Sequence, residues 1–200
     1  MRTWACRASA GACAALILAV AVSPASARSF SLSSQQIGVA WSPLNFIVGP
    51  FESNTIRCTL SLEGSFHTRT FAKVRESLVG YVTRSAIQSP CTNGEFHVLA
   101  ETPWHLRYEG FTGALPRITS IRTRLIEFSI WFNSALGPRC LYRSTVTNPA
   151  AFTLSFESGI PTGAALEVSL PETQGGMCLG TIRVEGRGGR VTTEATLSLI

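Results

Sequence analysis

Histidines, glutamates, arginines and cysteines are the side chains of this protein that could do chemistry. His97, Glu101 and His105 are spaced by four residues and would share one face of a long strand, a pattern that could bind a metal ion. Pro103 interrupts this pattern, because proline breaks a central strand ladder and is expected here to separate two strands. His67 would complete such a site only if the fold brings it alongside. We therefore expect solvent-facing histidines, no metal and no cofactor.

The acidic residues restrict the catalytic chemistry that is open to the chain. All 12 are glutamates, which excludes an Asp–Asp dyad and a strict Ser-His-Asp triad. No G-x-S-x-G motif is present, so the nucleophile elbow of esterases is excluded as well. Two glutamates such as Glu101 and Glu109 could hydrolyse a glycosidic bond if their separation fits that reaction. A secreted hydrolase that uses Glu and His is therefore the alternative function, and no catalytic residue is assigned.

Four arginines lie close together in the sequence: Arg107, Arg117, Arg122 and Arg124. The guanidinium fork binds carboxylate and phosphate groups through paired hydrogen bonds. The group is therefore a candidate anion-binding site, and an anionic polymer of the cell envelope is a partner that would suit it. The competing interpretation is a solvated strand face rich in arginine, since Lys73 is the only lysine of the chain.

Aromatic side chains are interleaved with these arginines. Trp104 and Tyr108 alternate along one predicted strand and form a candidate aromatic pocket, as in the mouth of a barrel. The same spacing is more typical of core residues whose polar tips reach the rim. The core interpretation is the favoured one.

Residues 1–27 have the form of a secretory signal peptide. Arg2 and Arg7 precede a short apolar run over residues 14–22, and small residues follow up to Ala27. The run is too short to cross a bilayer, which takes roughly 20 apolar residues. We expect cleavage after Ala27, a secreted or envelope-associated protein, and no membrane span after cleavage. Loss of the two arginines lowers the net charge from +5 to +3, which is too weak to indicate nucleic acid as a partner.

Four cysteines remain after cleavage: Cys58, Cys91, Cys140 and Cys178. An even number of cysteines in an exported chain predicts two disulfides. No C-x-x-C motif occurs, so zinc-knuckle and redox spacings are absent from the sequence. Three pairings are open. Because neighbouring strands in sequence tend to be neighbours in space, we expect Cys58–Cys91 and Cys140–Cys178.

The hydrophobic pattern predicts a mainly β chain. Residues 56–69 alternate strictly between apolar and polar side chains, which is the pattern of a strand with one buried face. Further short segments of this kind are separated by turns rich in Gly, Pro and Asn. They cover residues 95–101, 104–109, 121–132, 139–146, 151–156, 165–170, 179–185 and 191–200. The sequence thus predicts one antiparallel β-sandwich or barrel over residues 28–200, with two disulfides and at most one short helix.

The short helix is an option only over residues 70–79. Phe71, Val74 and Leu78 recur at spacings of three and four, which is the helical period. Gly80 interrupts the pattern. A strand over residues 78–87 is the competing prediction.

One long segment carries a resemblance. It runs from Glu101 to Ile118 as ETPWHLRYEGFTGALPRI, with GYVT at 80–83 and CTNG at 91–94 before it and CLYR at 140–143 after it. This series resembles a group of exported β-rich proteins of unknown function from high-GC Gram-positive soil bacteria, over roughly residues 55–145. The resemblance implies a signal peptide and a β-rich domain, and it assigns no functional residues.

Together these features predict an exported protein without catalytic activity. We expect a binding or structural module of the cell envelope or the extracellular space. The identity of its partner is not encoded in any motif of the sequence.

Overall fold

The computed structural model describes residues 29–48, 55–88, 91, 96–134, 139–174, 178 and 180–199. The expected signal peptide, residues 1–27, lies outside the described residues. Every regular element of the described chain is a strand. The strands are β1 (Ser29–Leu32), β2 (Gln36–Val48), β3 (Thr55–Phe66), β4 (Thr70–Ala72), β5 (Leu78–Gln88), β6 (Phe96–Ala100), β7 (Trp104–Ala114), β8 (Arg117–Ile126), β9 (Ser129–Ser134), β10 (Arg139–Arg143), β11 (Ala150–Glu157), β12 (Ile160–Gln174), β13 (Thr181–Val191) and β14 (Leu197–Leu199).

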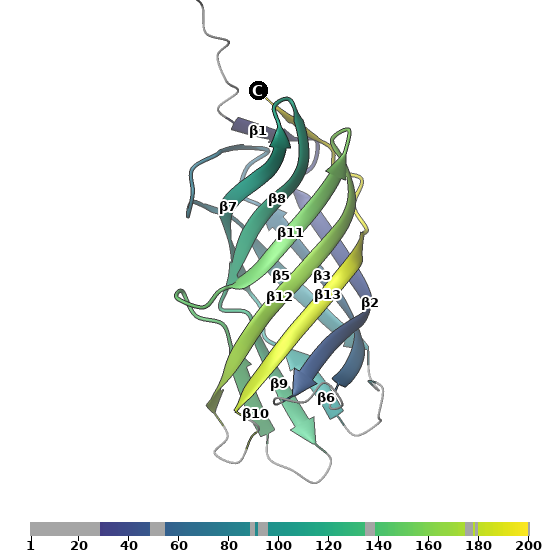
Figure 1. Cartoon of the computed structure of the whole chain (residues 1–200), viewed down its shortest axis with the longest axis vertical. Coiled ribbons are helices and arrows are strands. Elements are labelled where there is room, and N and C mark those ends of the chain that lie inside the picture. Colours follow the sequence, from purple (N-terminus) through teal and green to yellow (C-terminus); the bar gives the residue numbers. More distant parts are fainter. Residues whose placement is uncertain are drawn as a thin grey trace, which may run out of the picture.

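A closed antiparallel barrel forms the body of the molecule (Figure 1). Its strands are hydrogen-bonded in the order β2, β3, β5, β7, β8, β11, β12 and β13, and β13 pairs again with β2. The pairing of β11 with β12 is what closes the ring. The prediction of a mainly β, antiparallel fold with two disulfides is confirmed, and the closed ladder identifies a barrel rather than two stacked sheets.

Three shorter strands extend the barrel at one end. β10 pairs with the end of β12, β9 pairs with β10, and β6 pairs with β9 (Figure 1). In the chain they adjoin β7, β8 and β11, each across a short break. At the break between β8 and β9, Glu127 has a φ of 66°, which a continuous strand does not allow. The prediction of a single strand over residues 121–132 was therefore wrong.

A small sheet of β4, β1 and β14 covers the other end of the barrel (Figure 1). Phe30 of β1 is fully buried, and its ring lies 5.2 Å from that of Phe71 and 5.9 Å from that of Tyr108 of the barrel wall. The predicted strand over residues 191–200 is divided in the structure, because β13 ends at Val191 and β14 covers only three residues.

The barrel interior is filled by apolar side chains. In β3 the buried positions alternate with exposed or half-buried ones, as predicted from residue 56 onward. The largest fully buried side chains include several aromatic residues from different strands. These are Trp41, Trp104, Tyr142 and Phe46, together with Phe128, which lies at the break between β8 and β9.

The predicted helix over residues 70–79 is absent. β4 ends at Ala72, a turn follows, and β5 begins at Leu78, which confirms the competing strand prediction. Val74 and Leu78 are 59% and 43% exposed, so their helical spacing does not mark a buried face. A backbone hydrogen bond to β7 holds the turn instead. The N–H of Glu76 donates to the carbonyl of Tyr108 at 2.8 Å. Over the residues that the structure describes, no helix is long and apolar enough to cross a membrane.

Both disulfide pairings expected from the sequence are confirmed. Cys58 is bonded to Cys91 and Cys140 to Cys178, with Cα–Cα distances of 4.5 and 5.9 Å. Cys58 faces the core from β3, as its place on the apolar side of the alternation predicts. Two disulfides are consistent with an extracellular or otherwise oxidising location.

Candidate functional site

The candidate aromatic pocket lies within the packed core. Trp104 and Tyr108 are 0% and 3% exposed. Trp104 donates its indole N–H to the carbonyl of Glu101, and its ring packs against Phe128 at 4.5 Å. Burial raises the pKa of Tyr108, an effect that the nearby charge of Arg122 opposes. Both aromatic residues are therefore packed core side chains and do not form the wall of an open pocket.

The glutamates and the histidine considered for acid–base chemistry do not meet in one cleft. Glu101 accepts a hydrogen bond from Trp131 Nε1 at 2.6 Å, and Glu109 accepts one from an arginine. His105 Nδ1 lies 3.0 Å from Glu127, on the outer wall of the barrel. Water screens such an exposed pair. Among the described side chains, these three candidates therefore have separate partners.

The histidines do not assemble a metal site in the described part of the chain, where no three His, Cys or Glu side chains converge. Pro103 separates β6 from β7, as predicted. On the outer wall, the ring of Tyr81 lies between those of His67 and His105, at 4.6 and 4.9 Å. The side chain of His97 lies outside the described residues.

Three of the four candidate arginines lie together on the outer wall. Arg107 of β7 is directly opposite Arg124 of β8, and Arg122 lies two residues further along β8. Arg124 donates a hydrogen bond to Glu109 at 2.9 Å and lies 3.3 Å from Glu76. The bond to Glu109 raises the pKa of Arg124 above its ordinary value. We call Arg107, Arg122 and Arg124 the arginine face.

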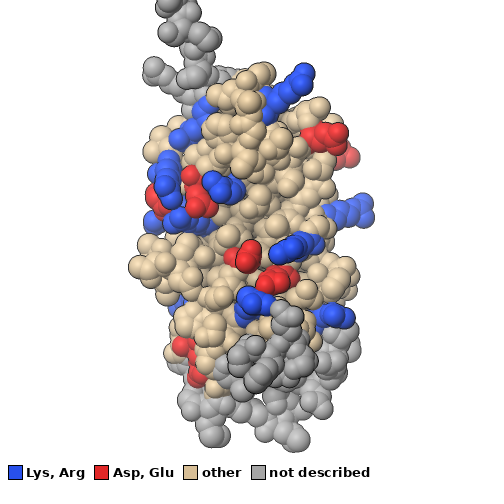
Figure 2. Space-filling view, in the orientation of Figure 1, with Lys and Arg blue, Asp and Glu red and all other residues tan. Residues whose placement is uncertain are grey.

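The members of the arginine face differ in their counter-charges. Arg124 is held by two carboxylates, whereas neither Arg107 nor Arg122 forms an ion pair with any residue that the structure describes. Figure 2 shows basic side chains interspersed with acidic ones on the visible face, rather than one continuous basic patch. The donors left for an external anion are thus those of Arg107 and Arg122.

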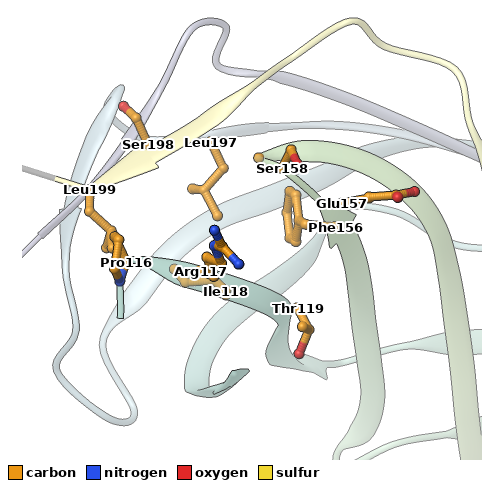
Figure 3. A pocket seen from close by; sticks show the side chains of 11 residues that line it. Pro116, Arg117, Ile118, Thr119, Phe156, Glu157, Ser158, Leu197, Ser198 and Leu199 are labelled. Atoms are coloured by element: carbon orange, nitrogen blue, oxygen red, sulfur yellow. The ribbon is translucent and has the colours of Figure 1, made fainter. Parts of the chain in front are cut away.

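Arg117 is separate from the arginine face. It lies five residues from Arg122 along β8, about 16 Å at the rise of an extended strand. There it lines a pocket of about 470 Å³ at the end of the barrel, together with residues of β11 and β14 (Figure 3). We call this cavity the end pocket. Phe156 and Leu197 are among the apolar residues around it. The sequence therefore grouped four arginines that the fold divides between two surfaces.

No protein-family model, curated protein or solved structure matches this chain. Its function is therefore argued from the arrangement of its own residues.

The walls of the end pocket were not identified from the sequence. Ile118 adjoins Arg117 in β8, but Phe156 comes from β11 and Leu197 from β14. No local spacing relates these segments, because they meet only when the barrel closes and β14 pairs with β1. A signal for this site was absent from the sequence pattern.

A polar cluster at the break between β6 and β7 was also missed. Trp131 donates to Glu101, while Arg139 lies 4.1 Å above the Trp131 ring and Arg143 lies 3.7 Å from Glu101. Glu101 also accepts a bond from Ser129 through its carbonyl. These contacts link β9 and β10 to the end of β6, so the cluster has a structural explanation.

Proposed function

We propose that this protein is an exported, non-catalytic module that binds an anionic polymer of the cell envelope through the arginine face. The signal-like residues 1–27 support export, and the two disulfides fit an oxidising compartment. Membership in the group of exported proteins that the segment from Glu101 to Ile118 resembles is part of the same proposal.

The main support for the proposal is that only one of the three arginines of the arginine face is paired with carboxylates. Glu109 and Glu76 occupy Arg124, while Arg107 and Arg122 have no carboxylate partner among the described residues. Both project from paired strands of one closed barrel, so their spacing is fixed by the backbone ladder. Guanidinium groups held at a fixed spacing suit the repeated carboxylates or phosphates of a polymer.

The rest of the wall suits a binding module better than an enzyme. Small side chains stand beside the arginine face on β11, where Ala151 is opposite Arg124 and Thr153 is opposite Arg122. A polymer could lie along these strands on the outside of the barrel without entering a cleft. The glutamate and histidine candidates of the hydrolase alternative have separate partners in the described structure, so that alternative has no supporting observation.

Retention on immobilised teichoic acid, a phosphate polymer, tests the proposal. The full protein should be retained at low salt and released near physiological salt, because exposed charges are screened over about 8 Å at 0.15 M. The double variant R107Q/R122Q should elute much earlier. The matched control is R187Q/R190Q, which removes the same charge from exposed positions of β13, beyond β11 and β12.

Comparing the two variants shows whether retention depends on the arginine face or only on the net charge of the protein. Early elution of R107Q/R122Q with unchanged elution of the control supports binding at the arginine face. Equal losses in both variants, or none in R107Q/R122Q, would overturn it.

A further inference from the structure

The end pocket is a concave part of the described surface that is separate from the arginine face. It lies between the β7–β8 hairpin, the β11–β12 hairpin and β14 (Figure 3). Its volume of about 470 Å³ falls within the range of small-molecule sites, which run from roughly 300 to 1,000 Å³. Three parts of the chain that are distant in sequence thus create one concave surface.

Apolar side chains form part of its wall, alongside polar ones such as Thr119 and Ser198. Ile118, Phe156 and Leu197 line it, and each is 8% exposed, so their side chains are anchored in the core while their edges reach the pocket. Pro116 and Leu199 extend the apolar surface on the opposite side (Figure 3). An apolar wall of this kind favours the hydrocarbon part of a ligand, because that surface leaves water on binding.

Arg117 supplies a cation to this apolar surface. Figure 3 shows its guanidinium directed toward Leu197, while the carboxylate of Glu157 points away from it. In the described structure no acidic side chain forms an ion pair with Arg117. Arg117 is exposed at the edge of the pocket, so its guanidinium can be reached by an anion whose apolar part lies against the pocket wall.

The pocket is held in shape by the backbone around it. Ser158 and Gly159 form the two-residue turn of the β11–β12 hairpin, and both have positive φ values, of 51° and 81°. The N–H of Leu197 donates to the carbonyl of Gly159 at 2.8 Å, which ties β14 to that turn. A ligand would therefore meet a wall that is already ordered, and binding would not require it to fold.

We propose that this pocket binds a small amphipathic anion, a carboxylate on an apolar body, with the carboxylate on Arg117 and the body against Ile118, Phe156 and Leu197. The combination of one cation with a mainly apolar wall selects this class. A purely polar anion would leave the apolar wall in water, and a neutral apolar molecule would leave the guanidinium without a partner. The proposal does not depend on the arginine face.

Octanoate is the probe for this site, and 1-octanol and octylammonium are its matched comparisons. The three have similar straight alkyl chains, and their head groups are anionic, neutral and cationic. Binding is measured by titration with NMR detection of the methyl signals of Ile118, Leu197 and Leu199. Octanoate should bind at least about tenfold more tightly than 1-octanol, since a charge-assisted contact adds that much, and octylammonium should bind most weakly.

Two variants test whether Arg117 causes the preference for octanoate. R117Q should reduce octanoate affinity to that of 1-octanol and leave 1-octanol binding unchanged, because the apolar wall is intact. R122Q removes the same charge from the arginine face and should keep the preference for octanoate. Equal affinities of the three probes for the unmodified protein, or an unchanged preference in R117Q, would overturn the proposal. A preference lost equally in R122Q would also overturn it, because the selection would then come from net charge.

Discussion

The indole of Trp41 occupies the space that a side chain on Gly189 would need. A Cβ placed on Gly189 would lie 2.6 Å from Cε2 of Trp41, and a Cβ on Gly186 would lie 2.8 Å from its Cδ1. Trp41 is 1% exposed and is one of the largest side chains of the core. β13 therefore makes room for the tryptophan of β2 by lacking side chains at two inward positions.

Gly189→Ala and Gly186→Ala should each destabilise the protein by about 1–3 kcal/mol, the usual cost of overpacking a filled core. The indole is walled in on all sides, so it cannot move away without displacing neighbours. Urea unfolding, followed by the fluorescence of the buried tryptophans, measures the loss of stability.

Gly163→Ala on β12 is the control for this prediction. A Cβ there has its nearest neighbour at 3.7 Å, which is an ordinary contact. We expect this variant to match the parent or to exceed it by up to about 1 kcal/mol, because alanine restricts the unfolded chain. Equal losses in all three variants would show that the space around Trp41 is not the cause.

β2, the strand that carries Trp41, could not be predicted from the alternation of its residues. Its residues in the core cluster are Ile37, Val39 and Trp41 and then Leu44, Phe46 and Val48, so the inward positions change from odd to even numbers. The register shift between Trp41 and Leu44 absorbs this change. A test for strict alternation fails across such a bulge, because a one-residue shift reverses every side chain.

β3 was predictable because its buried positions alternate along the whole strand. The disulfide pairings were predictable because each joins successive cysteines. The arginine face and the end pocket could not be predicted in this way. Arg107 and Arg124 became neighbours because β7 pairs with β8, a pairing that no local spacing in the sequence predicts. Arg117 was separated from them, because its place at the start of β8 puts it at the barrel end, where β14 supplies the opposite wall.

The disulfides should each contribute roughly 3–4 kcal/mol to the free energy of unfolding, because each closes a loop of intermediate length in the unfolded chain. The cysteines are 33 and 38 residues apart. Replacing Cys58 and Cys91 together by alanine, or Cys140 and Cys178 together, should therefore cost similar amounts in urea unfolding. Peptide mapping without reduction checks the pairing itself. A linked peptide joining Cys58 to Cys140 would contradict both the pairing and its energetic consequence.

Tyr108 should make the protein less stable in alkaline solution. Burial raises its pKa above the ordinary value of about 10, so the folded protein keeps the phenol proton where the unfolded chain has lost it. The stability contributed by the neutral phenol is fully present below a pH of about 10 and is lost as the pH rises through the higher pKa of the folded state. Tyr108→Phe should reduce this alkaline decline, measured as the urea midpoint over a series of pH values. Tyr81→Phe on the outer wall is the control, and an identical decrease in both variants would assign the effect to something other than burial.

Glu109→Gln should strengthen retention on immobilised teichoic acid. The Glu109 carboxylate holds Arg124 at 2.9 Å, and its side chain is 22% exposed. Neutralising it leaves Arg124 paired with Glu76 alone and makes the surface around Arg107 and Arg122 more positive by one charge. The variant should elute at higher salt than the parent, while its free energy of unfolding falls by no more than about 1 kcal/mol, as expected for a pair near the surface. Glu194→Gln makes the same charge change at an exposed position outside the arginine face. If Glu194→Gln shifts elution as far as Glu109→Gln does, retention follows net charge and the arginine face is not the binding surface. A shift confined to Glu109→Gln would show that Glu109 controls how many donors this face offers to an anion.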